Sequence, residues 1–486
     1  MSNIDYGADD PYTAATGLLE ILFHVYDNPD RGTGIHVLVA RCKNLLGNRL
    51  PPVFIHNAVG KQVNLFGKYP LHSDYAPSIL FATLFAVIAV LHLAVFSINF
   101  YKGHYFFLNL VWSFIAVVRL VSFVLRATWT LDITMAREGI AGEILLVIPS
   151  ILLISTNLIL AQRLFTWRHP VGGSRRLFWI FMISLYAFVA ILIVVAALGS
   201  AIPYLYFLST KRFLLYINLN RWISIMVILY TLTAVSLIGL SFWFPTKKDE
   251  KLYTYQPWWI ESFSPFYFVK KGAAQEAEES FMKRNSNHRH AIRVIAATHH
   301  HYKMVKGLSN ERGDLKHNVS LIMIIVSTIL LFISSLLRSI VVFQARTNFK
   351  SGPASEPVAM YFGWGVFEVI INLGFIVGRA DLRFYRPDIL PAKVRAIITA
   401  EQTTVATPMV SEEEYDDDDN DDGYYYNYEG TDDDELAIDG FHFDHEKSPD
   451  TTPYPVHTES KKKPEAHSPD YADSKNTDVE SDEFKF

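Results

Sequence analysis

Seven long stretches of almost unbroken apolar residues dominate this chain of 486 residues. The hydrocarbon core of a bilayer is about 30 Å thick, and a helix needs about 20 largely apolar residues to cross it. Polar residues do not return at every third or fourth position, as they would on the exposed face of a soluble helix. The sequence therefore predicts an all-α membrane protein, a bundle of seven transmembrane helices. The predicted spans are residues 78–100, 105–125, 139–162, 177–201, 222–244, 319–337 and 358–378.

The distribution of Lys and Arg beside the spans predicts how the bundle is oriented, because cytosolic flanks carry more of these residues. An odd number of spans puts the two termini on opposite sides. The side of the C-terminus carries 17 Lys and Arg near the spans, against 10 on the side of the N-terminus. We therefore expect the N-terminus outside and the C-terminus in the cytosol.

This orientation predicts the roles of the segments outside the spans. Residues 1–77 form an extracytosolic region whose two apolar patches are too short to span the membrane. These patches either lie on the membrane as surface helices or form a cap that covers the ends of the spans. We favour the cap, or simple packing. The membrane domain is residues 78–378, with a cytosolic loop at 245–318, and residues 379–400 are a basic juxtamembrane segment.

The chain after residue 400 has a different composition. Residues 401–486 contain 27 Asp and Glu against 6 Lys, whereas residues 1–400 contain 38 basic against 22 acidic side chains. Such a self-repelling segment with few aliphatic residues cannot bury enough apolar surface to fold. We expect a disordered acidic tail that is phosphorylated and that binds cytosolic protein partners.

The 245–318 loop combines an aromatic start with a basic second half. We predict that NHRHAIRVIAATHHHYKMVK, beginning at Asn287, forms a basic helix on anionic lipid headgroups of the cytosolic leaflet. Its histidines have no neighbouring Cys or Asp to complete a tetrahedral set, so we expect no metal. The single cysteine, Cys42, excludes an intramolecular disulfide.

Ionisable side chains inside the spans are candidates for function, because burying them in hydrocarbon is costly. Arg119 and Glu143 are expected at similar depth and are predicted to pair, with Arg126 sharing the carboxylate. Glu368 is expected near the midplane without an obvious partner, apart from a polar group such as Asn372 one turn on. Structural salt bridges and a ligand or proton site are both open at this stage. The intramembrane polar candidates are His92, Asn99, Arg119, Arg126, Glu143, Asn157, Gln162, Glu368 and Asn372.

No enzyme motif is present: the chain has no GxSxG elbow, HExxH pair or phosphate-binding glycine loop with Lys. His104 and His169 at helix ends, with Asp381, would be the only basis for a membrane-surface hydrolase, and nothing supplies a nucleophile. We expect no enzymatic activity, no catalytic residue, no cofactor and no nucleic acid partner.

Four motifs in order along the spans resemble a family of uncharacterised fungal seven-span integral membrane proteins that carry a domain of unknown function. The likeness runs from about Pro51 to Asp388, excluding most of the 245–318 loop. The resemblance implies a membrane address and no established activity. Asn157 and Gln162, which the resemblance also includes, stay open as interhelical or ligand contacts. The motif residues are Gly67, Pro70, Asp74 and Pro77; His92, Phe96, Asn99, Gly103, His104, Arg119, Arg126 and Trp129; Asn157, Leu158, Ala161, Gln162, Arg163, His169 and Pro170; and Asp381, Leu382, Arg383, Phe384, Pro387 and Asp388.

Two functional hypotheses follow from these features. The first is a receptor-like or scaffold protein whose cytosolic loop and phosphorylatable tail recruit partners. The second is a transporter or lipid translocator that uses Glu368 and the Arg119/Glu143 pair. We expect the plasma membrane as its location, with the vacuole and the endoplasmic reticulum as alternatives.

Overall fold

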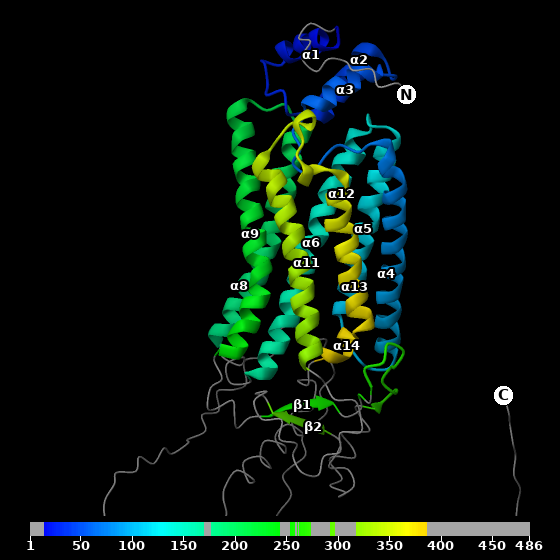
Figure 1. The fold of residues 1–486 in the computed structure, drawn as a ribbon, viewed down its shortest axis with the longest axis vertical. Helices are drawn as coiled ribbons and strands as arrows, with labels where there is room; N and C mark the ends of the chain where they lie inside the picture. The colour runs from blue at the N-terminus through cyan, green and yellow to red at the C-terminus, as the bar shows by residue number, and fades with distance from the viewer. Residues whose placement is uncertain are drawn as a thin grey trace, which may run out of the picture. The chain divides into compact units, whose positions relative to one another are not determined.

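The computed structural model describes residues 14–169, 176–243, 253–257, 260, 262–273, 292–296 and 317–385. All seven predicted spans are confirmed as helices long and apolar enough to cross a membrane. Figure 1 shows them side by side in one bundle. The first six are α4 (Tyr75–Tyr101), α5 (Leu108–Leu131), α6 (Ala136–Arg168), α8 (Arg176–Leu205), α9 (Thr210–Trp243) and α11 (His317–Gln344). The seventh consists of α12 (Pro357–Met360), the π-helix η7 (Tyr361–Val366) and α13 (Phe367–Val377), followed by the short α14 (Ala380–Arg383).

The helices extend beyond the predicted apolar cores. α5 continues from the predicted end at residue 125 to Leu131, and α11 continues from residue 337 to Gln344. A helix satisfies its own backbone hydrogen bonds, so it continues past the hydrocarbon until a capping or turn signal ends it. As a result Arg126 and Arg338 lie inside helices, whereas the predicted boundaries placed them outside.

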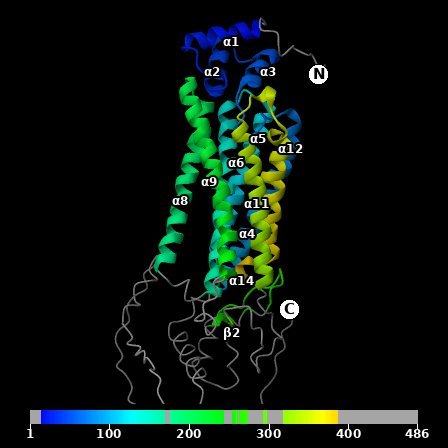
Figure 2. The ribbon, with the colours of Figure 1, turned by 60° about the vertical axis from the view of Figure 1, so that its left-hand side comes forward.

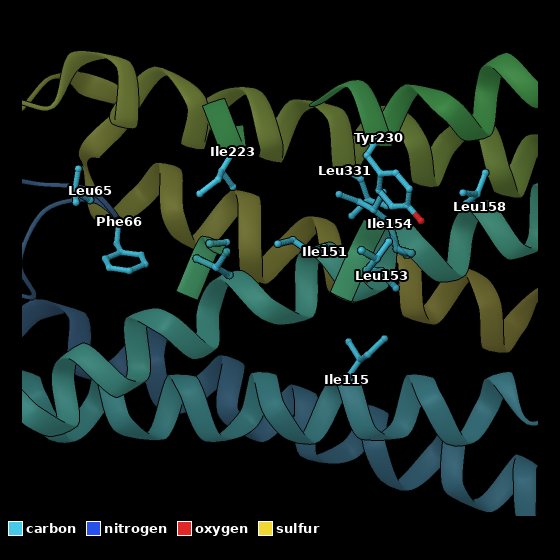
Figure 3. Packing of buried hydrophobic residues seen from close by; sticks show 14 of the residues in the cluster. Leu65, Phe66, Ile115, Ile151, Leu153, Ile154, Leu158, Ile223, Tyr230 and Leu331 are labelled. Carbon is cyan, nitrogen blue, oxygen red and sulfur yellow. The ribbon is translucent and has the colours of Figure 1, made fainter. Parts of the chain in front are cut away.

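The centre of the bundle is packed with aliphatic side chains. Figure 3 shows Ile115 of α5 facing a row from α6, with side chains of α9 and α11 closing the cluster. The labelled helical residues of this cluster are Ile115, Ile151, Leu153, Ile154, Leu158, Ile223, Tyr230 and Leu331. Large apolar side chains also point outward, for example Val90 and Leu198, which are 65% and 55% exposed. An apolar outer surface is expected where lipid replaces water as the solvent.

Three N-terminal helices form a cap on one end of the bundle: α1 (Ala14–Val25), α2 (Ile35–Leu46) and α3 (Pro52–Lys61) (Figures 1 and 2). The Tyr204 hydroxyl at the end of α8 accepts from the Leu65 N–H at 2.8 Å and donates to the Val63 carbonyl at 3.0 Å. Gly34 has a φ of 73°, and a Cβ there would lie 2.4 Å from the Phe207 ring. These contacts hold the N-terminal region against the end of α8 and the residues that follow it. We call this end of the bundle the cap end.

The opposite end, which we call the loop end, carries α14 and the connection from α9 to α11. Within that connection β1 (Tyr253–Pro257) pairs antiparallel with β2 (Ile292–Ala296). The predicted basic helix is therefore wrong over Ile292–Ala296. Three of these five residues are β-branched, which favours an extended backbone over a helix.

Several sequence predictions concern residues outside the described ranges. These include the rest of the predicted basic helix with its histidines, most of the 379–400 segment, and the acidic tail at 401–486.

The Tyr204 contacts generate a stability prediction. Tyr204→Phe removes the hydroxyl that satisfies two buried backbone groups, and we expect a loss of about 1–3 kcal/mol in the free energy of unfolding. Thermal unfolding of the purified protein in detergent micelles measures the effect. The matched control is Tyr206→Phe, because Tyr206 is 59% exposed. Equal unfolding temperatures for the two variants would contradict the assignment.

Candidate functional site

A buried ion pair joins α5 to α13 in the interior of the bundle. Arg119 and Glu368 have side chains that are 0% and 1% exposed. Arg119 Nε donates to Glu368 Oε2 at 2.9 Å, and Arg119 Nη2 donates to Oε1 of the same carboxylate. The pair is therefore bidentate, the geometry in which arginine and carboxylate interact most strongly.

α6 supplies further partners for this ion pair. Arg119 also donates to Ser150 Oγ at 2.9 Å and to the Leu146 carbonyl at 2.5 Å, while Ser150 Oγ donates to Glu368 Oε1 at 2.7 Å. Pro149 lies inside α6 and has no N–H, which weakens the helix's own hydrogen bonding in this turn. The network thus links three spans, and both charges have several partners, as buried charges require.

Two predictions about this pair are corrected by the structure. Arg119 does not pair with Glu143, and Glu368 is not without a charged partner. The sequence indicates the depth of a residue along its own span, but not which spans are neighbours. The predicted end of the second span at residue 125 also placed Arg126 too far out to be the main partner of Glu143.

Glu143 instead pairs with Arg126 near the cap end. Arg126 Nη1 donates to Glu143 Oε1, and Arg126 Nη2 donates to Asp74 Oδ2 at 3.1 Å. The Tyr361 hydroxyl donates to the Asp74 carbonyl at 3.0 Å and lies 2.6 Å from Ser78 Oγ. This second network connects α4, α5, α6 and η7. The expectation that Arg126 contacts the Glu143 carboxylate is confirmed.

His92 and Asn372 extend the central network to α4. His92 Nε2 lies 3.2 Å from Asn372 Oδ1, and Asn372 Nδ2 donates to the Glu368 carbonyl at 2.7 Å. Both side chains are buried. Asn372 therefore contacts the backbone of Glu368, whereas Arg119 and Ser150 bind its carboxylate.

Asn157 and Gln162 of α6 make interhelical contacts. Asn157 Nδ2 donates to Thr328 Oγ1 of α11 at 2.7 Å, and Ser327 Oγ donates to Asn157 Oδ1 at 2.7 Å. The Tyr186 hydroxyl of α8 donates to Gln162 Oε1. The sequence left Asn157 and Gln162 open as interhelical or ligand contacts, and the hydrogen bonds described above are interhelical.

At the loop end, Arg379 and Asp381 form a third buried network. Arg379 Nε and Nη2 donate to the two carboxylate oxygens of Asp381 at 2.9 and 2.7 Å. Asn99 Nδ2 at the end of α4 donates to Asp381 Oδ2 at 2.8 Å, and His104 Nε2 donates to the Asp381 carbonyl at 2.9 Å. We call the set Asn99, His104, Arg379 and Asp381 the Arg379 clamp.

The Arg379 clamp holds a segment of the connection between α9 and α11. Arg379 Nη1 donates to the carbonyls of Ser264 at 3.1 Å, Pro265 at 3.4 Å and Tyr267. The guanidinium carbon also lies 4.8 Å from the centre of the Phe268 ring. Residues 262–273, which we call the docked segment, therefore lie against the loop end of the bundle.

Two members of the clamp have shifted pKa values. Burial by itself would raise the pKa of Asp381, but the hydrogen bonds and charge of Arg379 hold it below its usual value of 3.8. Burial lowers the pKa of His104 below its usual 6.5. His104 Nδ1 has no hydrogen-bond partner in the described ranges, so a proton added there would place an unsatisfied cation in the interior.

Arg338 of α11 was missed by the sequence analysis, because the predicted sixth span ended at residue 337. The apolar run Ile340–Phe343 that follows Arg338 is the signal that would have placed it inside the helix. Within the described residues, no group of three or more His, Cys, Asp and Glu side chains is arranged to hold a metal ion.

Residues 170–385 match the model of a family described as "Protein of unknown function (DUF3112)". The match covers 216 of the 486 residues. The DUF3112 region includes α8, α9, α11, α13 and the Arg379 and Asp381 pair. Asn99 and His104 precede it in sequence but bond directly to Asp381 within it. No curated protein and no solved structure matches the chain.

The central ion pair generates the next prediction. Glu368→Gln leaves the Arg119 guanidinium buried without its carboxylate, and we expect a loss of about 3–5 kcal/mol in stability. Glu356→Gln is the matched control, since Glu356 pairs with Lys68 but its side chain is 45% exposed, and we expect a loss of about 0–1 kcal/mol. Thermal unfolding and the yield of monodisperse protein measure both. Similar losses in the two variants would contradict a structural role for the pair.

The Arg379 clamp predicts a dependence of stability on pH. A folded-state pKa below the unfolded value means that the unfolded chain binds more protons, so stability falls as the pH is lowered. For His104 the loss begins as the pH drops below 6.5 and ends at its lowered folded pKa, and for Asp381 it begins only below 3.8. His104→Gln keeps a side-chain donor without titrating, so its unfolding temperature should vary less below pH 6.5. His72→Gln, at an exposed position, should follow the wild type.

Proposed function

We propose that this protein is a non-enzymatic multi-pass membrane scaffold, or receptor-like component, that presents the connection between α9 and α11 to cytosolic protein partners. The observation that carries the proposal is the contact of one guanidinium, that of Arg379, with three carbonyls of the docked segment. The helix bundle serves as a frame that keeps this segment in one conformation.

The backbone of Arg379 supports a role beyond helix termination. Its φ of 54° and ψ of 56° are left-handed, a conformation that costs an L residue roughly 1–2 kcal/mol. Such strain persists only where surrounding interactions compensate for it, and it concentrates at functional sites. Here the compensation comes from Asp381 and from the docked segment.

The docked segment offers an exposed surface for recognition. Phe266 is 91% exposed, while Val269 on the same segment is 3% exposed and anchors it. An exposed aromatic side chain on a firmly held segment suits protein recognition, since little entropy is lost when a partner binds. Lys270 and Lys271 are also exposed, and we propose that they contact anionic lipid headgroups.

The proposal places the loop end in the cytosol and the cap end outside. The excess of Lys and Arg flanks on the side of the C-terminus supports this orientation. We propose the plasma membrane as the location, and imaging a C-terminal fluorescent fusion, with protease treatment of intact cells, tests both points.

The transporter alternative has less support from the geometry. It required Glu368 to be free for proton or substrate binding and Arg119 to pair with Glu143. Both oxygens of Glu368 are instead bound by Arg119, with Ser150 as a further donor. Solute uptake by reconstituted vesicles that is lost in a folded Glu368→Gln protein would favour transport over the scaffold.

Photo-crosslinking in cells tests the scaffold. A crosslinking amino acid in place of Phe266 should capture a reproducible set of proteins. Arg379→Gln removes the bonds to the three carbonyls and should reduce this capture severalfold, measured per molecule that reaches the membrane. Arg212→Gln, at an exposed position at the cap end, should leave capture unchanged. Equal capture by Arg379→Gln and the wild type, with both delivered to the membrane, would overturn the proposal.

A further inference from the structure

Arg338 lies in the cap-end half of the membrane domain and forms no ion pair within the described part of the chain. Its Nη2 donates to Ser200 Oγ at 3.3 Å, and its Nη1 has no hydrogen-bond partner among the residues that the structure describes. A cation inside a membrane domain is costly unless an anion or several acceptors compensate for its charge. The question is what compensates for Arg338.

The carboxylates at the cap end, Glu143 and Asp74, are hydrogen-bonded to Arg126. Glu143 is close enough to interact electrostatically with Arg338, but its hydrogen-bonded partner is Arg126. Asp74 shares Arg126 and also lies at the N-terminus of α4, where the helix dipole favours a negative charge. Neither carboxylate therefore serves as a direct counterion of Arg338.

The guanidinium of Arg338 is held in a defined orientation. Ser200 Oγ, which accepts from Nη2, donates to Asn220 Oδ1 at 2.8 Å. Asn220 Nδ2 is in turn bonded to the Gly199 carbonyl at 2.7 Å. The rings of Phe66 and Trp364 have centres 5.2 and 6.0 Å from the guanidinium carbon. These hydrogen bonds from α8 and α9 fix the guanidinium so that Nη1 is directed away from Ser200.

Two small cavities meet at this arginine. One lies between α11 and the start of the seventh span, and the other lies between α6, α9 and α11. Ser334, Arg338 and Trp364 line both, and Ile151 and Ile223, labelled in Figure 3, belong to the wall of the second. Each cavity has room for about one water molecule or one ion of similar size.

A glycine of η7 keeps this space open. A Cβ at Gly363 would lie 3.2 Å from Ser334 Oγ, so a larger residue would press on the hydroxyl that lines both cavities. π-helical turns such as η7 are rare and frequently occur at functional sites.

We propose that Arg338, together with the hydroxyl of Ser334, binds one small monovalent anion of halide size. The positive charge favours an anion, and the water-sized space beside it favours a small ion over a phosphate or carboxylate headgroup. A partly enclosed, low-dielectric site strengthens the attraction between the guanidinium and the ion. This site is distinct from the Arg379 clamp at the loop end and does not depend on its function.

Thermal unfolding of the full-length protein in lipid nanodiscs tests the site, with sodium chloride, sodium bromide and sodium gluconate compared at equal ionic strength. The halides should raise the unfolding temperature of the wild type above that in gluconate, because an ion that binds only the folded state stabilises it. Arg338→Gln should weaken bromide binding about tenfold or more, since a charge-assisted hydrogen bond is lost. Arg221→Gln is the matched control, because Arg221 also lies beside a ring and donates to a carbonyl but is not at the cavities.

Two further measurements keep the test decisive if Arg338→Gln folds poorly. Gly363→Ala retains the charge but narrows the cavity, so it should reduce the halide shift. Iodide should quench a saturable part of the tryptophan fluorescence, and Trp364→Phe should lose that part. The proposal is overturned by a wild type equally stable in halide and gluconate, by a halide shift that persists in Arg338→Gln, or by stabilisation seen only with anionic lipid.

Discussion

The bidentate pair of Arg119 and Glu368 is the interaction on which the arrangement of the spans depends. Lipid offers no water to solvate a separated charge, so each member is stable only where the other is present. α5 and α13 are thereby held in one relative depth and rotation, and Ser150 adds α6 to the same constraint. Aliphatic packing alone is less directional and would tolerate sliding of one span along another.

Two further networks of buried ion pairs hold spans together at the two ends of the bundle in the same way. Near the cap end Arg126 joins Glu143 and Asp74, and at the loop end Arg379 joins Asp381. Each network bonds spans that are far apart in sequence. Together they make the α4, α5, α6 and α13 side of the bundle a rigid frame, against which the docked segment is held. Arg338, on α11 beside this frame, has no ion pair within the described residues, and these networks do not compensate for its charge directly.

Sequence reasoning located four of the buried charged residues but assigned only part of their pairing. Arg119, Arg126, Glu143 and Glu368 are all buried in ion pairs, yet the predicted pairing of Arg119 with Glu143 was wrong. The motif residues Asn99 and His104, chosen by resemblance, meet Asp381 in one network. Arg338 escaped notice because hydropathy marks the apolar core of a span and not the full length of its helix.

The sequence by itself determined the class of fold, because about 20 apolar residues can satisfy their backbone in hydrocarbon only as a helix. It also determined which side chains carry a large free-energy cost when they are buried in the membrane. Only the tertiary structure decided which charges meet, because the order of the helices around the bundle leaves no periodic trace in a single chain. The left-handed Arg379 and the cavities beside Arg338 likewise arise from contacts between segments that are distant in sequence.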